Sequence, residues 1–398
     1  MKKQLLTLAI CLSTISSFAA DLYVNGSGLP NTYATLQAAI DAASDGDNIY
    51  VSATETHNGP VTVDKSVYII SDQAGSKFQL VGDVIVGNNI DQVTIVGADG
   101  ISVSSQNNAG SRVNVNLISS SISALSITHN NYKVNIYDCF VGGTATFRNG
   151  IIIGSELSNI SIQNETGVAV DTIKLIANEF EYLTYTNQIH NFEIYNNFVN
   201  KIVSYSEAGI YFSGLPNNAT NYGVIANNTI EFCGSNSSSS SYWSYYPGIK
   251  FSSTPSSFSG LTIVNNYITG VGSSYTAYGI DISNSFPNVY IANNKFYNTQ
   301  AIVSNTTNHY LADNMSGNCQ YSTSNGNLSS GYSNLGLDQA PYYDIDGTRN
   351  DIGNSGGAHA WSQYHTSGGK AVIFDLEIPA QIYLGTNQSI KAKGVHKN

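Results

Sequence analysis

Six short stretches of the chain share one pattern, in which alternating apolar residues are followed by an asparagine and further apolar residues. The asparagines are Asn178, Asn197, Asn228, Asn266, Asn294 and Asn314. The apolar positions recur with a period of two, which is the period of a β-strand. Successive asparagines lie 19, 31, 38, 28 and 20 positions apart. The shortest spacing, about 20 residues, is typical of one coil of a solenoid, and the longer spacings contain insertions. Each coil then contributes one such strand.

Stacking of these coils as parallel strands about 4.8 Å apart places equivalent residues directly above one another. The asparagines then form a column whose side chains hydrogen-bond to one another at the inside of a turn. The repeat therefore predicts an all-β fold, a right-handed parallel β-helix. We expect it to form one elongated domain over residues 20–320.

The first residues have the form of a secretory signal peptide. Residues 1–19 combine Lys2 and Lys3 with an apolar run and an exit of small residues. No later run approaches the roughly 20 apolar residues needed to span a bilayer. We therefore expect a secreted protein, either extracellular, periplasmic or on the cell surface, with no membrane span.

Charge and cysteine content limit the possible partners. Without the two lysines of the leader, 14 basic residues face 27 acidic ones, a net charge of −13. Such a charge excludes nucleic acid as a natural partner. The remaining cysteines, Cys139, Cys233 and Cys319, are odd in number and scattered, so they indicate no disulfide framework. We expect a monomer.

A helix signal stands near the mature N-terminus, in residues 32–51. Thr35, Leu36, Ala39, Ile40 and Ala43 fall on one helical face. An apolar helix face of this kind suits a cap, which covers the open end of a β-helix and the unpaired strand edge there.

The segment YATLQAAIDAASDGDNIYVSATETHNGPVTVDKSVYIIS resembles the opening of the pectin lyase-like superfamily, whose cap helix and first coils share this pattern. The matching positions are Leu36, Gln37, Ala38, Ala39, Ile40, Asp41, Gly46, Asp47, Ile49, Val51, Val61, Val63, Lys65, Ser66 and Val67. The resemblance implies the β-helix fold. It implies no single activity, because the superfamily includes lyases, hydrolases, esterases and proteins without a known reaction. The motifs of polygalacturonases and pectin methylesterases are absent from this chain.

A second strand column reads GIYFSG, GIKFSS, GIDISN and AIVSNT over residues 209–306. In this pattern the middle residue faces water, and on successive coils it is Tyr211, Lys250, Asp281 and Val303. Other chemically active residues lie on or beside the insertions between the strand columns. They are Tyr205, Glu207, Trp243, Tyr246 and Tyr278.

These residues predict a polysaccharide-binding face, on which Tyr205, Tyr211, Trp243, Tyr246 and Tyr278 stack on sugar rings. A polysaccharide lyase or glycoside hydrolase is the alternative. In that case Lys250 would be the base, and Asp281 or Glu207 would hold a cation. No arginine lies in the second strand column, whereas pectate-lyase-like enzymes commonly use one there. Two further alternatives are a surface salt bridge and a structural adhesin whose loop at residues 235–246 contacts a protein.

A second candidate site lies in residues 321–398, which we expect to form a closing coil and a small C-terminal β cap. Asp344, Asp346, Asn350 and Asp351 place oxygen ligands around Gly347 in a pattern that suits Ca²⁺. The alternative is that these side chains hydrogen-bond turn amides. The segment also resembles the DxDGxRNDIGAxGG closing motif of many secreted bacterial β-helix proteins, which implies a structural role. Two strand-like runs follow, at residues 371–378 and 381–392.

Overall fold

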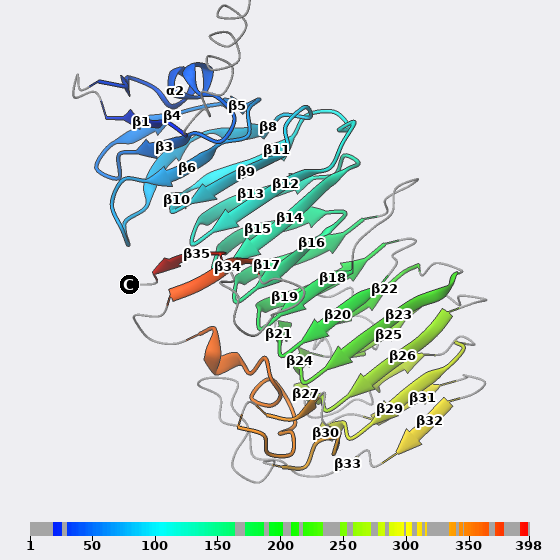
Figure 1. The fold of residues 1–398 in the computed structure, drawn as a ribbon. Coiled ribbons are helices and arrows are strands. Elements are labelled where there is room, and N and C mark those ends of the chain that lie inside the picture. Colours follow the sequence, from blue (N-terminus) through cyan, green and yellow to red (C-terminus); the bar gives the residue numbers. More distant parts are fainter. Residues whose placement is uncertain are drawn as a thin grey trace, which may run out of the picture.

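A computed structural model describes most of the chain. The described residues are 19–25, 30–163, 172–186, 191–201, 208–214, 218–233, 247–252, 258–271, 278–282, 286–297, 300–304, 309–312, 315–316, 334–339, 342–344, 346–365, 371–377 and 391–396. Their strands stack into an elongated solenoid (Figure 1). Residues 1–18, which carry most of the predicted signal peptide, lie outside the described part.

One wall of the solenoid is a parallel sheet of 14 strands, here sheet A. In spatial order its strands are β2 (Thr32–Tyr33), β1 (Asp21–Val24), β3 (Asn48–Val51), β6 (Tyr68–Ser71), β9 (Gln92–Val96), β12 (Val113–Ile118), β14 (Tyr132–Tyr137), β16 (Gly150–Ile153), β18 (Ile173–Ile176), β20 (Phe192–Tyr195), β23 (Asn218–Ala226), β26 (Phe258–Val264), β29 (Val289–Ala292) and β32 (His309–Ala312).

The facing wall is a parallel sheet of 16 strands, here sheet C. Its main path is β33 (Met315–Ser316), β30 (Lys295–Tyr297), β27 (Tyr267–Val271), β24 (Thr229–Cys233), β21 (Phe198–Lys201), β19 (Glu179–Tyr185), β17 (Glu156–Ile162), β15 (Phe140–Phe147), β13 (Ser121–Ile127), β11 (Ile101–Ser105), β8 (Asp83–Val86) and β5 (Val61–Val63). The predicted second column forms its branch, β22 (Ile210–Phe212), β25 (Ile249–Phe251), β28 (Tyr278–Ile282) and β31 (Gln300–Ser304).

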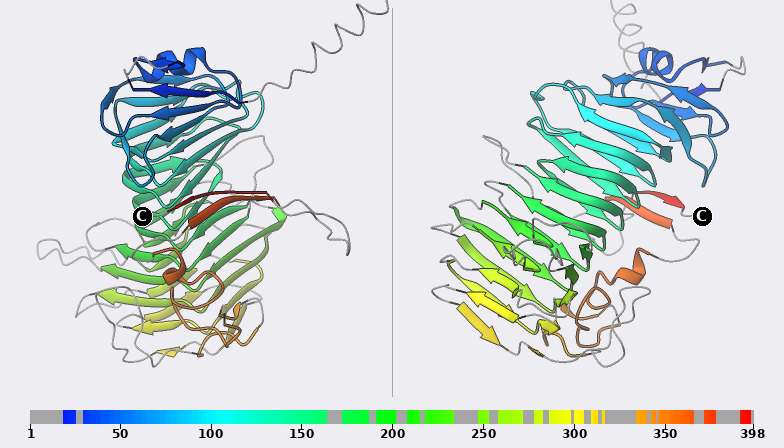
Figure 2. Two further views of the ribbon diagram at one scale, coloured as in Figure 1. Left: turned by 60° about the vertical axis from the view of Figure 1, so that its left-hand side comes forward. Right: turned by 180° about the vertical axis from the view of Figure 1, so that it is seen from behind.

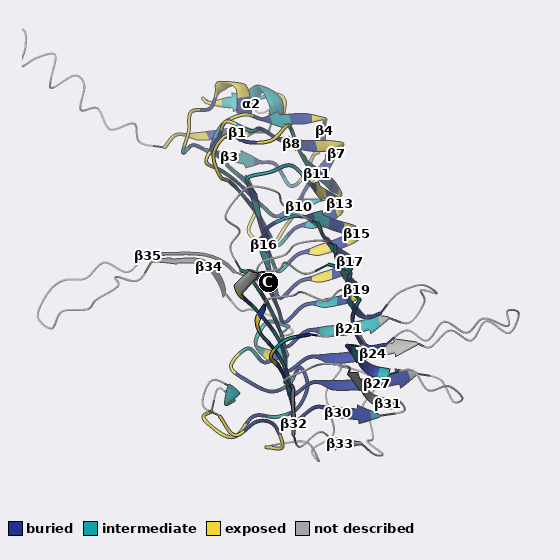
Figure 3. Ribbon diagram, turned by 90° about the vertical axis from the view of Figure 1, so that its right-hand side faces the viewer, coloured by how far each residue is buried: buried dark blue, intermediate teal, exposed yellow. Residues whose placement is uncertain are grey.

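A small third sheet, β10 (Ala98–Asp99), β7 (Phe78–Val81) and β4 (Thr56–Asn58), completes the first coils. All of these pairings are parallel, so the predicted all-β parallel β-helix is confirmed. Side chains alternate between the core and the surface along the strands, as in the buried–half-buried–buried pattern of β25. In Figure 3 the buried positions follow the inside of the stack.

The predicted asparagine column is confirmed over the described coils. Asn228 Oδ1 accepts from both the backbone N–H and the amide of Asn197, at 2.9 and 3.0 Å. The same pair of bonds joins each neighbouring pair of ladder residues from Asn178 to Asn294. Asn314 lies outside the described residues.

The ladder continues upstream with other side chains, where the sequence repeat could not be aligned. Ser155 Oγ accepts the backbone N–H of Cys139, Cys139 Sγ accepts that of Ser120, and Ser120 Oγ accepts that of Ala98. Asn178 joins the two parts, because its Oδ1 accepts the N–H of Ser155. The ladder therefore fixes the register of the coils before residue 170.

The predicted capping helix is α2 (Leu36–Ala42), which covers the edge strand β5. Gln37 acts as a strand partner for this edge, because its amide accepts the N–H of Thr62 and donates to the carbonyl of Thr62. Lys65 donates to the carbonyls of Ile40 and Asp41. The residues that carry the pectin lyase-like resemblance thus hold the cap in place.

One residue of the predicted apolar helix face is corrected. Thr35 is exposed and lies at the N-cap, where its hydroxyl accepts the N–H of Ala38 at 3.2 Å. Threonine is favoured at this position because it satisfies an N–H that the first helical turn leaves unpaired.

Residues 334–339, 342–344 and 346–365 run along one flank of the solenoid and are called the strap here. The strap includes the 3₁₀ helix η3 (Trp361–Gln363). Leu337 donates its N–H to Asn265, Asn350 bonds Asn227, and His365 bonds the carbonyl of Ala177. The described part of the predicted closing coil therefore lies beside several coils of the stack (Figure 2).

The strands β34 (Ala371–Glu377) and β35 (Lys391–His396) pair antiparallel, apart from the solenoid sheets. The first of the two predicted C-terminal strands is thus found. β35 overlaps the end of the second predicted run, of which residues 381–390 lie outside the described part. No helix in the described part of the chain has the length and apolar character that crossing a bilayer requires.

Candidate functional site

The predicted water-facing row lies on the outer face of sheet C. Tyr211 pairs with Lys250, and Lys250 pairs with Asp281, on adjacent parallel strands. All three side chains are half-buried, between core residues on either side. The structure therefore brings these three predicted residues together in register, about 4.8 Å apart along the axis.

This row is the end of a longer one that sequence reasoning missed. On the five coils before Tyr211 the same register position is a hydroxyl residue, and one coil further upstream it is Ile85. The hydroxyl residues in chain order are Ser104, Ser126, Thr146, Ser161 and Thr184. We call the eight positions from Ser104 to Asp281 the outer row. Seven steps between adjacent strands give the outer row a length on the order of 34 Å.

Two local contacts fix the downstream end of the outer row. The hydroxyl of Tyr211 donates to Ser252 Oγ at 3.1 Å, and Ser252 Oγ donates to the carbonyl of Phe212. Beneath the row, the rings of Phe212 and Phe251 stack in the core with centroids 4.5 Å apart. Tyr211 is thus held on a rigid, well-packed base. Tyr278 begins β28, three residues before Asp281, and is half-buried.

The other predicted members of this site, Tyr205, Glu207, Trp243 and Tyr246, lie outside the described residues. Their part in a site stays a prediction.

The ladder asparagines of the repeat take no part in this outer face. Each ladder asparagine from Asn178 to Asn294 has no exposed surface. Their amides are used by the ladder and by neighbouring carbonyls. A ligand on sheet C would instead meet hydroxyls, carboxylates and aromatic rings.

The predicted calcium ligands lie in the strap, where they bind backbone amides. Asp344 Oδ1 accepts the N–H groups of Gly357 and Asp351. Asp346 Oδ1 accepts both the N–H and the hydroxyl of Thr348. Asp351 accepts the N–H of Asn334, at 2.7 Å.

The fourth predicted ligand, Asn350, is fully buried. Its amide bonds Asn227 and donates to the carbonyl of Tyr342. Burial raises the pKa of both Asp344 and Asp351, and repulsion by Asp346 adds to it at both residues, with repulsion by Asp344 adding further at Asp351. Within the described ranges no group of three acidic, histidine or cysteine side chains is placed to hold a metal ion. These contacts match the alternative in which the motif shapes turns, and calcium binding stays a prediction.

A shallow hollow of about 310 Å³ lies on the same outer face of sheet C, nearer the ladder turn. Phe140, Glu156 and Glu179 line it from adjacent coils, since Phe140 pairs with Glu156 and Glu156 with Glu179. Burial and repulsion by Glu156 raise the pKa of Glu179. Phe140 is 47 % exposed, so its ring forms an apolar part of the lining.

Sequence reasoning missed the hollow because Phe140 and Glu156 precede the coils that could be aligned. The sequence does contain a pattern that could have identified these lining residues. Each follows directly after a ladder residue, Cys139 or Ser155, just as Glu179 follows Asn178.

Comparisons with known proteins assign no family to this chain, because no family model matches it and no curated protein is significantly similar to it.

Proposed function

We propose that this protein is an exported polysaccharide-binding protein, and that the polysaccharide lies along the outer row of sheet C, parallel to the solenoid axis. The observation that carries the proposal is the unbroken register from Ser104 to Asp281. A linear glycan repeats its hydroxyl groups along its length, and a row of residues repeated on every coil is the matching protein surface.

The chemistry of the outer row suits sugars. Serine and threonine hydroxyls both donate and accept hydrogen bonds. Lys250 and Asp281 add a donor and an acceptor of stronger bonds at the downstream end. Tyr211 and Tyr278 supply partly exposed rings of the kind that stack on sugar rings.

The charge of the chain narrows the class of glycan. A net charge of −11 repels a polyanion such as a polyuronate at low ionic strength. Lys250 lies beside the carboxylate of Asp281, so the row offers no strong positive patch. We therefore expect a neutral polysaccharide.

The test is retention of the mature protein in gels that contain neutral or acidic polysaccharides. Lys250→Ala and Asp281→Ala are expected to weaken retention, whereas Lys133→Ala on β14 of sheet A is the control. Retention by no glycan, or equal retention of all three variants, would refute the proposal.

The same samples are assayed for new unsaturated and reducing ends. Cleavage that is lost in Lys250→Ala or Asp281→Ala would make the protein a lyase or a hydrolase. If the protein neither binds nor cleaves any of the glycans, the remaining hypothesis is a structural adhesin that contacts a protein partner.

A further inference from the structure

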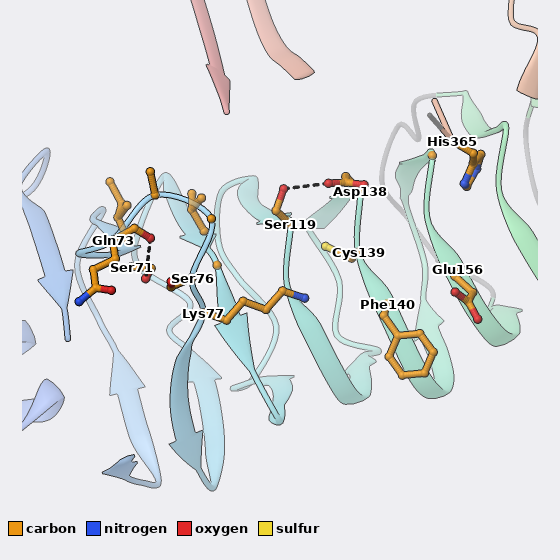
Figure 4. Close-up of a pocket in the computed structure, with 16 residues that line it drawn as sticks. Ser71, Gln73, Ser76, Lys77, Ser119, Asp138, Cys139, Phe140, Glu156 and His365 are labelled. Carbon is orange, nitrogen blue, oxygen red and sulfur yellow. Dashed lines mark hydrogen bonds between the residues drawn. The ribbon is translucent and has the colours of Figure 1, made fainter. Parts of the chain in front are cut away.

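A groove of about 570 Å³ runs along the flank of the solenoid, at the ladder turns of the upstream coils (Figure 4). It is called the turn groove here. Its polar and aromatic lining comes from the loop before β7, from the turns, from the starts of β15 and β17 and from the strap. These residues are Lys77, Ser119, Asp138, Phe140, Glu156 and His365.

The turn groove continues a column that already binds polypeptide. The residue before each ladder position has a positive φ, between 46° and 68°, on every coil from Gly97 to Asn293. Downstream, these residues bind the strap. Asn196 donates to the carbonyls of Asn354 and Gly356, and Asn293 donates to that of Leu335.

The described strap stops where the groove starts. His365 bonds the carbonyl of Ala177 at 2.6 Å, stacks on Trp361 and lines the end of the groove. Upstream of it the same column supplies Gly97, Ser119, Asp138 and Gly154, all of which line the groove.

The lining of the groove carries a small negative charge. Asp138 accepts from Ser119 Oγ at 3.1 Å, and the exposed Glu156 stands one coil further along. The one lysine among the described residues of the lining, Lys77, donates to Ser121 Oγ at 2.8 Å. With a neutral histidine, the charged residues of the lining sum to one negative charge, and the exposed ring of Phe140 lies beside Glu156.

The sulfur in the floor of the groove is not a reactive group. Cys139 is 3 % exposed, and burial raises the pKa of its thiol to about 12. A neutral, buried thiol is a poor nucleophile. Cys139 is therefore not expected to carry covalent chemistry in the groove.

We propose that the turn groove binds an extended peptide segment of a partner protein that carries basic side chains. Continuity with the strap interface favours a polypeptide, because the same column of turns holds the strap. The carboxylates of Asp138 and Glu156 favour lysine or arginine, and the side chain of Phe140 packs against their aliphatic stems. This site is independent of the outer row.

The experiment uses the mature protein and two fluorescein-labelled octapeptides, one alternating lysine with serine and one alternating glutamate with serine. Fluorescence polarisation is expected to show binding of the lysine peptide only. Asp138→Asn with Glu156→Gln is expected to weaken binding at least tenfold. Asparagine suits the positive φ of residue 138, since four asparagines occupy equivalent positions downstream. Glu181→Gln, exposed on the outer face of sheet C, is the control.

Hydrogen exchange locates the bound peptide. Slower exchange is expected in residues 96–100 and 137–140, and no change in residues 258–271. Equal binding of both peptides, no binding at millimolar peptide, an unaltered double variant, or protection elsewhere would each overturn the proposal. Loss of glycan retention in the double variant, without peptide binding by the parent, would show that the groove is a glycan site instead.

Discussion

Replacement of Asn228 by alanine is expected to destabilise the protein strongly. Its Nδ2 donates to the carbonyls of Ile194 and Ala226 and to Asn266 Oδ1, at 2.9, 3.1 and 2.9 Å. Its Oδ1 accepts two N–H groups of Asn197. Because Asn228 is fully buried, water cannot replace these partners.

The expected cost follows from the groups left without partners. Asn228→Ala leaves two buried donors of Asn197 without an acceptor, and each such group costs about 1 to 3 kcal/mol. We therefore expect a loss of about 2 to 6 kcal/mol in the free energy of unfolding. Asn228→Ser is expected to lose about half as much, because Ser155 shows that a hydroxyl can accept the backbone N–H of the preceding coil.

Urea unfolding followed by circular dichroism measures this loss, and hydrogen exchange of residues 192–201 shows whether it is local. Asn114→Ala is the control, because its amide makes a long bond of 3.4 Å at the surface. Such a surface change is expected to cost within about 0.5 kcal/mol. If Asn228→Ala cost no more than the control, the ladder would not be a source of stability and the reasoning would be refuted.

Three further outcomes are expected. Gln37→Ala removes both bonds to Thr62 at the edge of sheet C, so it should lower the Tm and cause association at high concentration, seen by light scattering; a monomer of unchanged Tm would contradict this. Glu179 has a raised pKa in the folded state, so its contribution to stability is present at pH below about 4.3 and is lost as the pH rises through the folded pKa. Glu179→Gln should therefore raise the Tm at pH 7 but not at pH 4, and equal effects at the two pH values would contradict a pKa raised by burial and by repulsion from Glu156. Millimolar calcium should raise the Tm of the parent and not of Asp344→Asn if the predicted calcium site exists, and no shift in either protein would refute it.

The fold could be predicted from the sequence because asparagine is suited to the ladder. Its amide donates and accepts at once, so Asn178 and its equivalents are all the same residue and mark each coil in the sequence. Upstream the slot needs only an acceptor for a backbone N–H. Ser120, Cys139 and Ser155 all supply one, so no single letter marks the slot and the register could not be read.

The candidate sites were predictable to a smaller extent for the same reason. Lys250 and Asp281 occupy the same position in two copies of one short motif, GIKFSS and GIDISN. Their pairing on adjacent coils could therefore be inferred from the sequence. The outer row upstream and the hollow at Phe140 depend on the register of coils that carry no shared motif. The strap joins residues as far apart as Asn196 and Gly356, and no local pattern shows such a contact.

In four of the repeats two asparagines stand side by side, and each has its own structural role. In each pair the second asparagine belongs to the ladder, and the first has a positive φ and bonds the strap, as Asn196 and Asn227 do. Asparagine also suits the positive φ of the first position, although Ser119, Asp138 and Ala177 adopt the same conformation. Asparagine stands at the first position on Asn196, Asn227, Asn265 and Asn293, the coils whose turn side chains bond the strap. It is replaced at Ala177, where the strap contact is made through the carbonyl to His365. The doubled asparagines of the repeat, from Asn196 to Asn294, therefore lie on the coils whose turn side chains bond the strap. Further upstream the turn residues are Ala177, which the strap contacts through its carbonyl, and Gly154, where the ring of Tyr364 leaves no room for a side chain.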